Sequence, residues 1–304
     1  EIYHLSLRRQ RQMCIRDRPK SKHAIQTIMK HFTIKISVVV TLLFSGSGFA
    51  QNQLTLHYDK PAKEWTEALP VGNGRLGAMI FGKTDEELIQ LNEASLWSGG
   101  PVSKNVNPTA FDYLAPTRKA LAEGDYEKAY DLTKKMQGVY SESYMPLGDL
   151  ILKQDLGGKT PTTYYRGLNI QDGVATTTFT IDGVSYKREI FASAPGESII
   201  IRLTASKAKS ISFTTSTSSK LNNTVTTNKD MLVVKGKAPA HADPSYISYN
   251  KQPVIYEDVS GCRGMRFETL VKPVVKDGTV SLQNGQIVVK GATEVVLVVT
   301  AATS

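Results

Sequence analysis

Cysteine is scarce in this chain. Only two of the 304 residues are cysteines, Cys14 and Cys262. Cys14 lies in an N-terminal segment that we exclude from the fold below, so one thiol remains and no internal disulfide is expected. Stability must therefore come from a buried core, which about 250 residues can provide. No histidine lies near Cys262 in the sequence, and we interpret this cysteine as structural rather than nucleophilic.

An excess of positive charge is also missing once the N-terminal segment is set aside. The whole sequence has 37 Lys and Arg against 28 Asp and Glu, a net charge of +9. Nine of the basic and two of the acidic side chains precede residue 51, so the remainder carries a net charge of +2. This near balance argues against nucleic acid as a partner.

The N-terminal part has no apolar run long enough to span a membrane. Ile36–Phe44 is almost entirely apolar, but its length of about nine residues is far short of the roughly 20 that a spanning helix needs. A short basic stretch precedes it, and Gly48 and Ala50 supply small residues before a cleavage site. These features predict a secretory signal peptide over residues 29–50, rather than a membrane anchor, and a mature periplasmic or extracellular protein that begins at Gln51.

Both ends of the sequence carry further expectations. Residues 1–28 have neither periodicity nor turn signals, and we interpret them as a leader that is not native to the protein. At the other end, "EVVLVVTAATS" (residues 294–304) is an apolar strand without a polar tail. Such a strand predicts a domain that continues or joins another, and hence a truncated sequence.

Turn signals at short spacing dominate the C-terminal half. Asp182-Gly183, Asp277-Gly278 and Asn284-Gly285 each separate two strand-like segments, which predicts β-hairpins. Many short strands without alternating helices predict a mainly β fold of two large antiparallel sheets packed face to face. The one helical stretch, near residues 110–137, is broken at Glu123–Asp125 and predicts a short helical insertion.

The segment "LPVGNGRLGAMIFG" (Leu69–Gly82) contains a literal G-x-G-x-x-G. This fingerprint binds a dinucleotide only where a strand precedes it and a helix opens from it. No apolar run of strand type precedes it, and "AMIFGK" indicates a buried strand after it, so no dinucleotide site is predicted. Asn73 tolerates a left-handed turn, and Arg75 offers a planar fork for oxygen acceptors. Together with Trp65 and Glu67 they indicate either a ligand loop or a tight turn packed beneath another domain.

The segment "QLNEASLW" carries the second group of candidate residues. Strand alternation places Gln90 and Asn92 on one face and their aliphatic neighbours on the other. Glu93, Ser95 and Trp97 follow. Amides, a carboxylate, a hydroxyl and an aromatic plane are the groups of a sugar subsite, because sugar hydroxyls need polar partners and their C–H face stacks on indole. The alternative is a turn with buried polar partners and a core tryptophan.

A third candidate is "YMPLGDL", in which we expect Asp149 to fix a turn. His57, His241 and Asp243 lack the spacing of any recognised metal site. We therefore expect no metal and no cofactor.

Six segments, taken in order, resemble the N-terminal domain of glycoside hydrolase family 95, the exo-acting α-L-fucosidases. They are "EWTEALPVGNGRLGAMIFG", "IQLNEASLWSGGP", "YMPLGDL", "YYRGLNI", "YKREIFASAPGESIIIRL" and "GMRFETLV". The similarity covers about residues 54–304. It implies a β-supersandwich, residues 51–304, that precedes a linker and an (α/α)6 helical barrel absent from this sequence. One departure is Met145, where the family resemblance leads us to expect glutamine.

The resemblance also implies the chemistry. Family members hydrolyse terminal α-L-fucosyl linkages of glycans with inversion, and α-L-galactose is a related substrate. Their general-acid glutamate and water-activating groups belong to the barrel, so neither Glu67 nor Glu93 is expected to be catalytic. A free-standing carbohydrate-binding or structural β-sandwich is the alternative function. The residues expected to contact substrate or the neighbouring helical domain are Asn73, Arg75, Gln90, Asn92, Glu93, Ser95 and Trp97.

Overall fold

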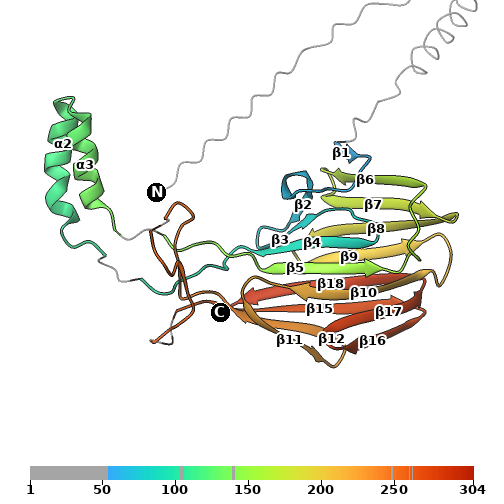
Figure 1. Cartoon of the computed structure of the whole chain (residues 1–304). Helices are drawn as coiled ribbons and strands as arrows, with labels where there is room; N and C mark the ends of the chain where they lie inside the picture. Colours follow the sequence, from blue (N-terminus) through green and yellow to red (C-terminus); the bar gives the residue numbers. More distant parts are fainter. Residues whose placement is uncertain (1–53, 103–105, 139–140, 248, 260, 262) are drawn as a thin grey trace, which may run out of the picture. The chain divides into compact units, whose positions relative to one another are not determined.

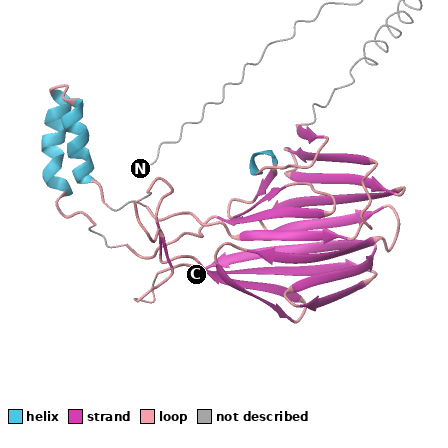
Figure 2. Cartoon of the chain, viewed as in Figure 1, coloured by secondary structure: helices cyan, strands magenta, loops and turns pink. Residues whose placement is uncertain are grey.

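Strands are the main regular structure of the computed structural model (Figure 2). It describes residues 54–102, 106–138, 141–247, 249–259, 261 and 263–304. The expected leader (1–28), the expected signal peptide (29–50) and Cys262 lie outside the described residues.

Two large antiparallel sheets form the domain (Figure 1). Nine strands form sheet A, in the spatial order β1 (Thr55–Tyr58), β6 (Thr163–Asn169), β7 (Val174–Ile181), β8 (Val184–Ser193), β9 (Ser198–Ala205), β18 (Glu294–Thr303), β15 (Arg266–Lys276), β12 (Met231–Lys237) and β11 (Asn222–Asn228). Seven form sheet B, in the order β16 (Thr279–Gln283), β17 (Gln286–Ala292), β10 (Ile211–Ser218), β5 (Gly148–Gln154), β4 (Glu86–Glu93), β3 (Leu76–Ile80) and β2 (Leu69–Gly72). A small sheet pairs β13 (His241–Ala242) with β14 (Val254–Ile255). The predicted fold class is confirmed.

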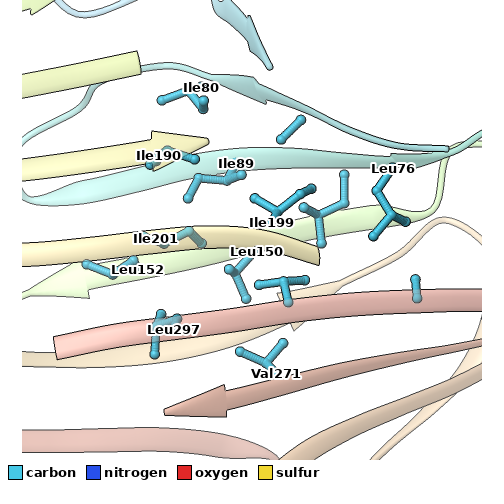
Figure 3. Packing of buried hydrophobic residues seen from close by; sticks show 14 of the residues in the cluster. Leu76, Ile80, Ile89, Leu150, Leu152, Ile190, Ile199, Ile201, Val271 and Leu297 are labelled. Atoms are coloured by element: carbon cyan, nitrogen blue, oxygen red, sulfur yellow. The ribbon is translucent and has the colours of Figure 1, made fainter. Parts of the chain in front are cut away.

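Alternating side chains on the facing strands build one core between the two sheets. On β4, Ile89 and Leu91 are buried at 0% and 6% exposure, whereas Gln90 and Asn92 are half-buried on the outer face of sheet B, as the alternation predicts. Each fully buried Leu or Ile contributes about 1.5–3 kcal/mol relative to exposure. Figure 3 shows residues of this core from both sheets, among them Ile80, Ile89, Leu150 and Leu152 of sheet B and Ile190, Ile199, Ile201, Val271 and Leu297 of sheet A.

A buried ion pair also joins the two sheets. Arg188 Nη1 on β8 lies 2.5 Å from Glu87 Oε2 on β4, and both side chains are at most 2% exposed. Gly82 N donates to Glu87 Oε1 at 2.8 Å, and Arg188 Nη2 donates to Gln154 Oε1 at 3.2 Å. Burial raises the pKa of Glu87, and the Arg188 guanidinium opposes that rise. The pair fixes the register of one sheet over the other, and nothing in the local sequence pattern predicts it.

The predicted hairpin turns are confirmed by their backbone angles. Asp182 and Gly183 have φ of 50° and 74°, and Asn284 and Gly285 have φ of 50° and 69°. Positive φ at both central residues defines the turn that matches the twist of paired strands, and Asp-Gly and Asn-Gly adopt it most readily.

The helical insertion lies between β4 and β5. It consists of η2 (Ala110–Tyr113), α2 (Leu114–Ala122) and α3 (Tyr126–Met136), which confirms the predicted break. Asp125 caps α3 by accepting a hydrogen bond from Lys128 N at 3.1 Å. Within the described part of the chain, no helix has both the length and the apolar character that a membrane span requires.

The glycine motif lies on a hairpin of sheet B. A short 3-10 helix η1 (Trp65–Glu67) leads into β2, and β2 pairs with β3 around the turn at Asn73. The expectation that no strand precedes the glycines was wrong, because β2 is an edge strand, where Pro70 costs no ladder hydrogen bond. A strand and not a helix follows, as predicted, so the geometry of a dinucleotide site is absent from this hairpin.

Candidate functional site

Several loops meet at one end of the sandwich, which we call the loop end. It comprises the turn 73–75, the segment 94–99 after β4, residues 141–147 before β5, and the turn 194–197 between β8 and β9. Hydrogen bonds connect these segments across the two sheets, for example Arg75 Nη2 to Glu197 O at 3.4 Å. Ser95 Oγ also lies 2.6 Å from Thr303 Oγ1 at the end of β18. Six of the seven predicted site residues lie in these segments or in the last two residues of β4.

An exposed aromatic pair lies at the loop end. Trp97 and Tyr144 form an isolated β-bridge, and their rings meet edge to face with centroids 5.2 Å apart. Trp97 is 42% exposed and Tyr144 is 40% exposed. The alternative of a core tryptophan at this position is therefore wrong. Exposed aromatic faces held at a fixed angle suit stacking on a ligand.

Tyr144 also holds Asn92. The Tyr144 hydroxyl lies 2.6 Å from Asn92 Oδ1, to which it can donate, and 2.9 Å from the carbonyl oxygen of Glu93. Burial raises the pKa of the Tyr144 hydroxyl, so it stays protonated and able to donate near neutral pH. Among the described residues, none accepts a hydrogen bond from Asn92 Nδ2. The amide therefore keeps a donor for a ligand, beside the aromatic pair.

A row of polar side chains continues across the outer face of sheet B. Gln90 Nε2 donates to Asp149 Oδ1 at 3.2 Å, and Ser218 Oγ donates to Asp149 Oδ2 at 3.4 Å. Asp149 thus belongs to β5 and links neighbouring strands, so the expectation that it fixes a turn was wrong. Tyr144 and Ser218 were missed as site residues. "YMPLGDL" signalled the first, and only sheet topology reveals the second.

Asn73 and Arg75 tie the two sheets together. Asn73 Oδ1 accepts from Arg75 N at 3.0 Å and Leu76 N at 2.8 Å, and its Nδ2 donates to Ser193 O at 2.9 Å. Arg75 Nη1 donates to Ala301 O at 2.6 Å. All these partners are protein groups, so the polar atoms of Asn73 serve the packed turn rather than an open ligand loop.

Glu93 and Ser95 fix the start of the next loop. Glu93 is 2% exposed, and its Oε2 accepts from Ser95 N and Ser95 Oγ, both at 2.7 Å. Arg75 Nη1 lies 3.7 Å from the other carboxylate oxygen. The seven predicted residues therefore fall into two groups. Gln90, Asn92 and Trp97 lie at the surface. Glu93 is buried, and Asn73, Arg75 and Ser95 are half-buried or exposed but hold the loops in place through their hydrogen bonds.

An acid-rich network, which we call the His241 network, joins four segments of the chain nearby. His241 Nδ1 lies 3.0 Å from Glu142 Oε1, and its Nε2 lies 3.0 Å from Asp243 Oδ1. Arg263 Nη2 and Ser98 Oγ donate to Glu142 at 3.1 and 2.8 Å. A hydrogen bond from the ring to Glu142 raises the pKa of His241. The network holds the loop that carries Tyr144.

Comparison with known proteins identifies the class of this domain. A two-sheet sandwich that holds an exposed aromatic pair and the free amide donor of Asn92 at one end can contact a sugar. The profile of the family described as "Glycosyl hydrolase family 65, N-terminal domain" matches residues 56–304, and the chain belongs to this family. The resemblance to the N-terminal domain of a glycoside hydrolase is confirmed.

Three curated relatives carry fucosidase names. "Alpha-L-fucosidase 2" of Arabidopsis thaliana is 32% identical over 231 residues, 74% of this chain and 27% of the relative. "Probable alpha-fucosidase A" of Aspergillus niger is 29% identical over 185 residues, 55% of this chain and 23% of the relative. "Probable alpha-fucosidase A" of Aspergillus oryzae is 27% identical over 157 residues, 48% of this chain and 21% of the relative. The chain thus spans about a quarter of the length of these relatives.

Proposed function

We propose that this chain is the N-terminal domain of a secreted α-L-fucosidase of glycoside hydrolase family 95. The whole enzyme would remove terminal α-L-fucosyl residues from glycans with inversion. The fucosidase relatives and the order of the six resembling segments support the assignment. The observation that carries a role in substrate contact is the exposed Trp97–Tyr144 pair beside the free amide donor of Asn92.

Within this proposal the domain binds substrate and does not supply the catalytic acid. An inverting hydrolase needs a protonated carboxylic acid and a water-activating group on opposite sides of the sugar. At the loop end, hydrogen bonds from protein groups already occupy Glu93, Glu142 and Asp149. Burial alone would raise the pKa of Glu142, but hydrogen bonds from His241 and Ser98 lower it, which is unsuitable for a general acid. The proposed acid and water-activating groups belong to a helical barrel outside this sequence.

The geometry suits recognition of a deoxysugar. The C–H face and the methyl group of fucose are apolar and can pack on the Trp97–Tyr144 pair. Asn92 Nδ2 can donate to a ring or hydroxyl oxygen, while Tyr144 fixes the orientation of the amide through Asn92 Oδ1. An exposed aromatic face and a fixed donor together orient a sugar better than either group alone.

The proposal is tested with an aryl α-L-fucoside and two proteins. The 304-residue chain should show no turnover above a buffer blank. The longer protein encoded by the extended reading frame should hydrolyse the substrate, and proton NMR should show β-L-fucose as the first product. An in-frame stop codon directly after Ser304, or turnover by the repurified 304-residue chain, would contradict the proposal. The stop codon would favour a free-standing binding module.

A further inference from the structure

A cavity of about 840 Å³ lies at the opposite end of β5 from the loop end. Its floor is the outer face of sheet B, where Lys153, Thr214 and Val288 come from three adjacent strands. The connection between β5 and β6, residues 155–161, forms its rim. The volume lies within the range of about 300–1,000 Å³ typical of ligand pockets.

Four exposed charged side chains line this cavity, and none of them forms an ion pair with a residue that the structure describes. In the part of the chain that the structure describes, Lys153, Lys290 and Asp85 make no ion pair or side-chain hydrogen bond. Among the same described residues, the Asp155 carboxylate accepts only from the backbone N–H of Gly157, at 3.3 Å. Lys159, on the rim, is already paired with Asp182. The free groups are therefore two ammonium groups and two carboxylates.

This balance of charges decides the class of ligand. An anion would be attracted by the two lysines but repelled by Asp85 and Asp155, so the net attraction would be small. A neutral molecule with many hydroxyls uses both kinds of group, since each hydroxyl can donate to a carboxylate and accept from an ammonium group. The floor also presents the side chain of Val288, on which C–H groups can pack.

We propose that this cavity is a second, non-catalytic binding site for a neutral oligosaccharide. The inference goes beyond the proposed function, because it concerns a different end of sheet B and does not depend on the Trp97–Tyr144 pair. A site here would retain a glycan chain on the domain independently of the loop end.

The test uses the ¹⁵N-labelled 304-residue chain and neutral fucosyllactose as the probe. Titration to millimolar concentration should shift the backbone amide signals of Thr214, Val288 and Gly157, which lie around the cavity. Sialyllactose, which places a carboxylate on the same lactose core, should bind more weakly, and inorganic sulfate should leave these signals unchanged. Tighter binding of sialyllactose or sulfate at these residues would overturn the assignment to a neutral sugar.

Two variants test whether the probe binds in the cavity itself. Lys153→Met combined with Asp85→Asn removes one ammonium group and one carboxylate without altering the net charge, and should weaken binding by about tenfold. Val288→Trp should block the floor. The matched control, Lys235→Met with Glu268→Gln, removes an exposed pair on sheet A and should bind as the parent chain does. Melting curves show which variants are folded.

A third variant distinguishes this inference from the proposed function. Trp97→Ala should leave the shifts at Thr214, Val288 and Gly157 unchanged, because the loop end is not part of the cavity. Loss of these shifts in folded Trp97→Ala, or their persistence in both folded cavity variants, would overturn the second site while leaving the fucosidase assignment intact.

Discussion

At the scale of single residues, Asn92 and Trp97 differ from their neighbours because part of each remains available to a ligand. Asn92→Ala in the longer protein should leave a sugar oxygen without its donor. The expected loss is about 1–3 kcal/mol, or roughly five- to 150-fold in kcat/KM for an aryl α-L-fucoside. Trp97→Ala should lower kcat/KM as well, because it removes a stacking face that is 42% exposed.

Trp65→Ala provides the matched control for Trp97→Ala. Trp65 is 59% exposed and lies in η1, away from the segments of the loop end. Its removal should change neither kcat/KM nor Tm. If Asn92→Ala and Trp97→Ala melt early but retain normal kcat/KM when folded, these two residues are scaffold and the site assignment fails.

The buried pair of Glu87 and Arg188 is expected to contribute to the stability of the fold. Arg188→Met leaves a fully buried carboxylate without its cation, and should lower the free energy of unfolding by about 3–5 kcal/mol. Adding Glu87→Met should recover much of the loss, because two apolar side chains can replace a buried pair. Urea unfolding measures both variants.

Arg202→Met is the control for Arg188→Met. Arg202 is 46% exposed on sheet A and pairs with Glu294 and Glu189. Exposed pairs contribute about 0–1 kcal/mol, so this variant should unfold almost as the parent does. If Arg188→Met and Arg202→Met lowered the free energy of unfolding equally, burial would not explain the contribution of the Glu87–Arg188 pair to stability.

At the scale of elements, the His241 network should make the stability of the loop end depend on pH. The pKa of His241 is raised from its ordinary value of 6.5, chiefly by its hydrogen bond to Glu142. The protonated ring therefore stabilises the fold below that value, and the contribution is lost as pH rises through the higher folded pKa. Glu142 has a lowered pKa, so its contribution is present above its ordinary value of 4.5 and is lost at lower pH.

The network should therefore stabilise the fold most between about pH 4.5 and 6.5. Urea unfolding of the parent chain and of His241→Gln should differ most in this window and converge at alkaline pH. His57→Gln is the control, because His57 stacks on Tyr165, 5.0 Å between centroids, and forms no ion pair with any residue that the structure describes. If the difference in unfolding free energy between the parent chain and His241→Gln grew as the pH rose above this window, the raised pKa of His241 would be contradicted.

The sequence predicts elements better than it predicts the site, and the reason is physical. Alternation along β4 and the Asp-Gly and Asn-Gly turns are local signals, and they gave the sheets and hairpins correctly. The contact of Tyr144 with Asn92 spans 52 positions, and that of Arg188 with Glu87 spans 101. Such pairs depend on the order of strands in the sheets, which local periodicity does not encode. Asp149 shows the same limit, because its partners lie on two other strands.

At the scale of the whole molecule, the proposed export can be tested directly. We propose that the small residues Gly48 and Ala50 mark a cleavage site before Gln51. Expressed in a secreting host, the protein should appear outside the cytoplasm with Gln51 as its first residue, as N-terminal sequencing measures. The control is Ala50→Arg, which should block processing. Exported protein that begins at Glu1 or Met29 would contradict a signal peptide over residues 29–50.

The position of β18 has a consequence for how the domain is made in the cell. β18 pairs with β9 on one side and β15 on the other, in the interior of sheet A, although it follows every other described strand in the sequence. During translation the two halves of sheet A remain unjoined, with open edges, until β18 has left the ribosome. Such late, long-range closure is slow and exposes strands that can aggregate. Nascent chains stalled before Glu294 should therefore stay protease-sensitive and bound to chaperones, whereas chains stalled well beyond Thr303 should become resistant.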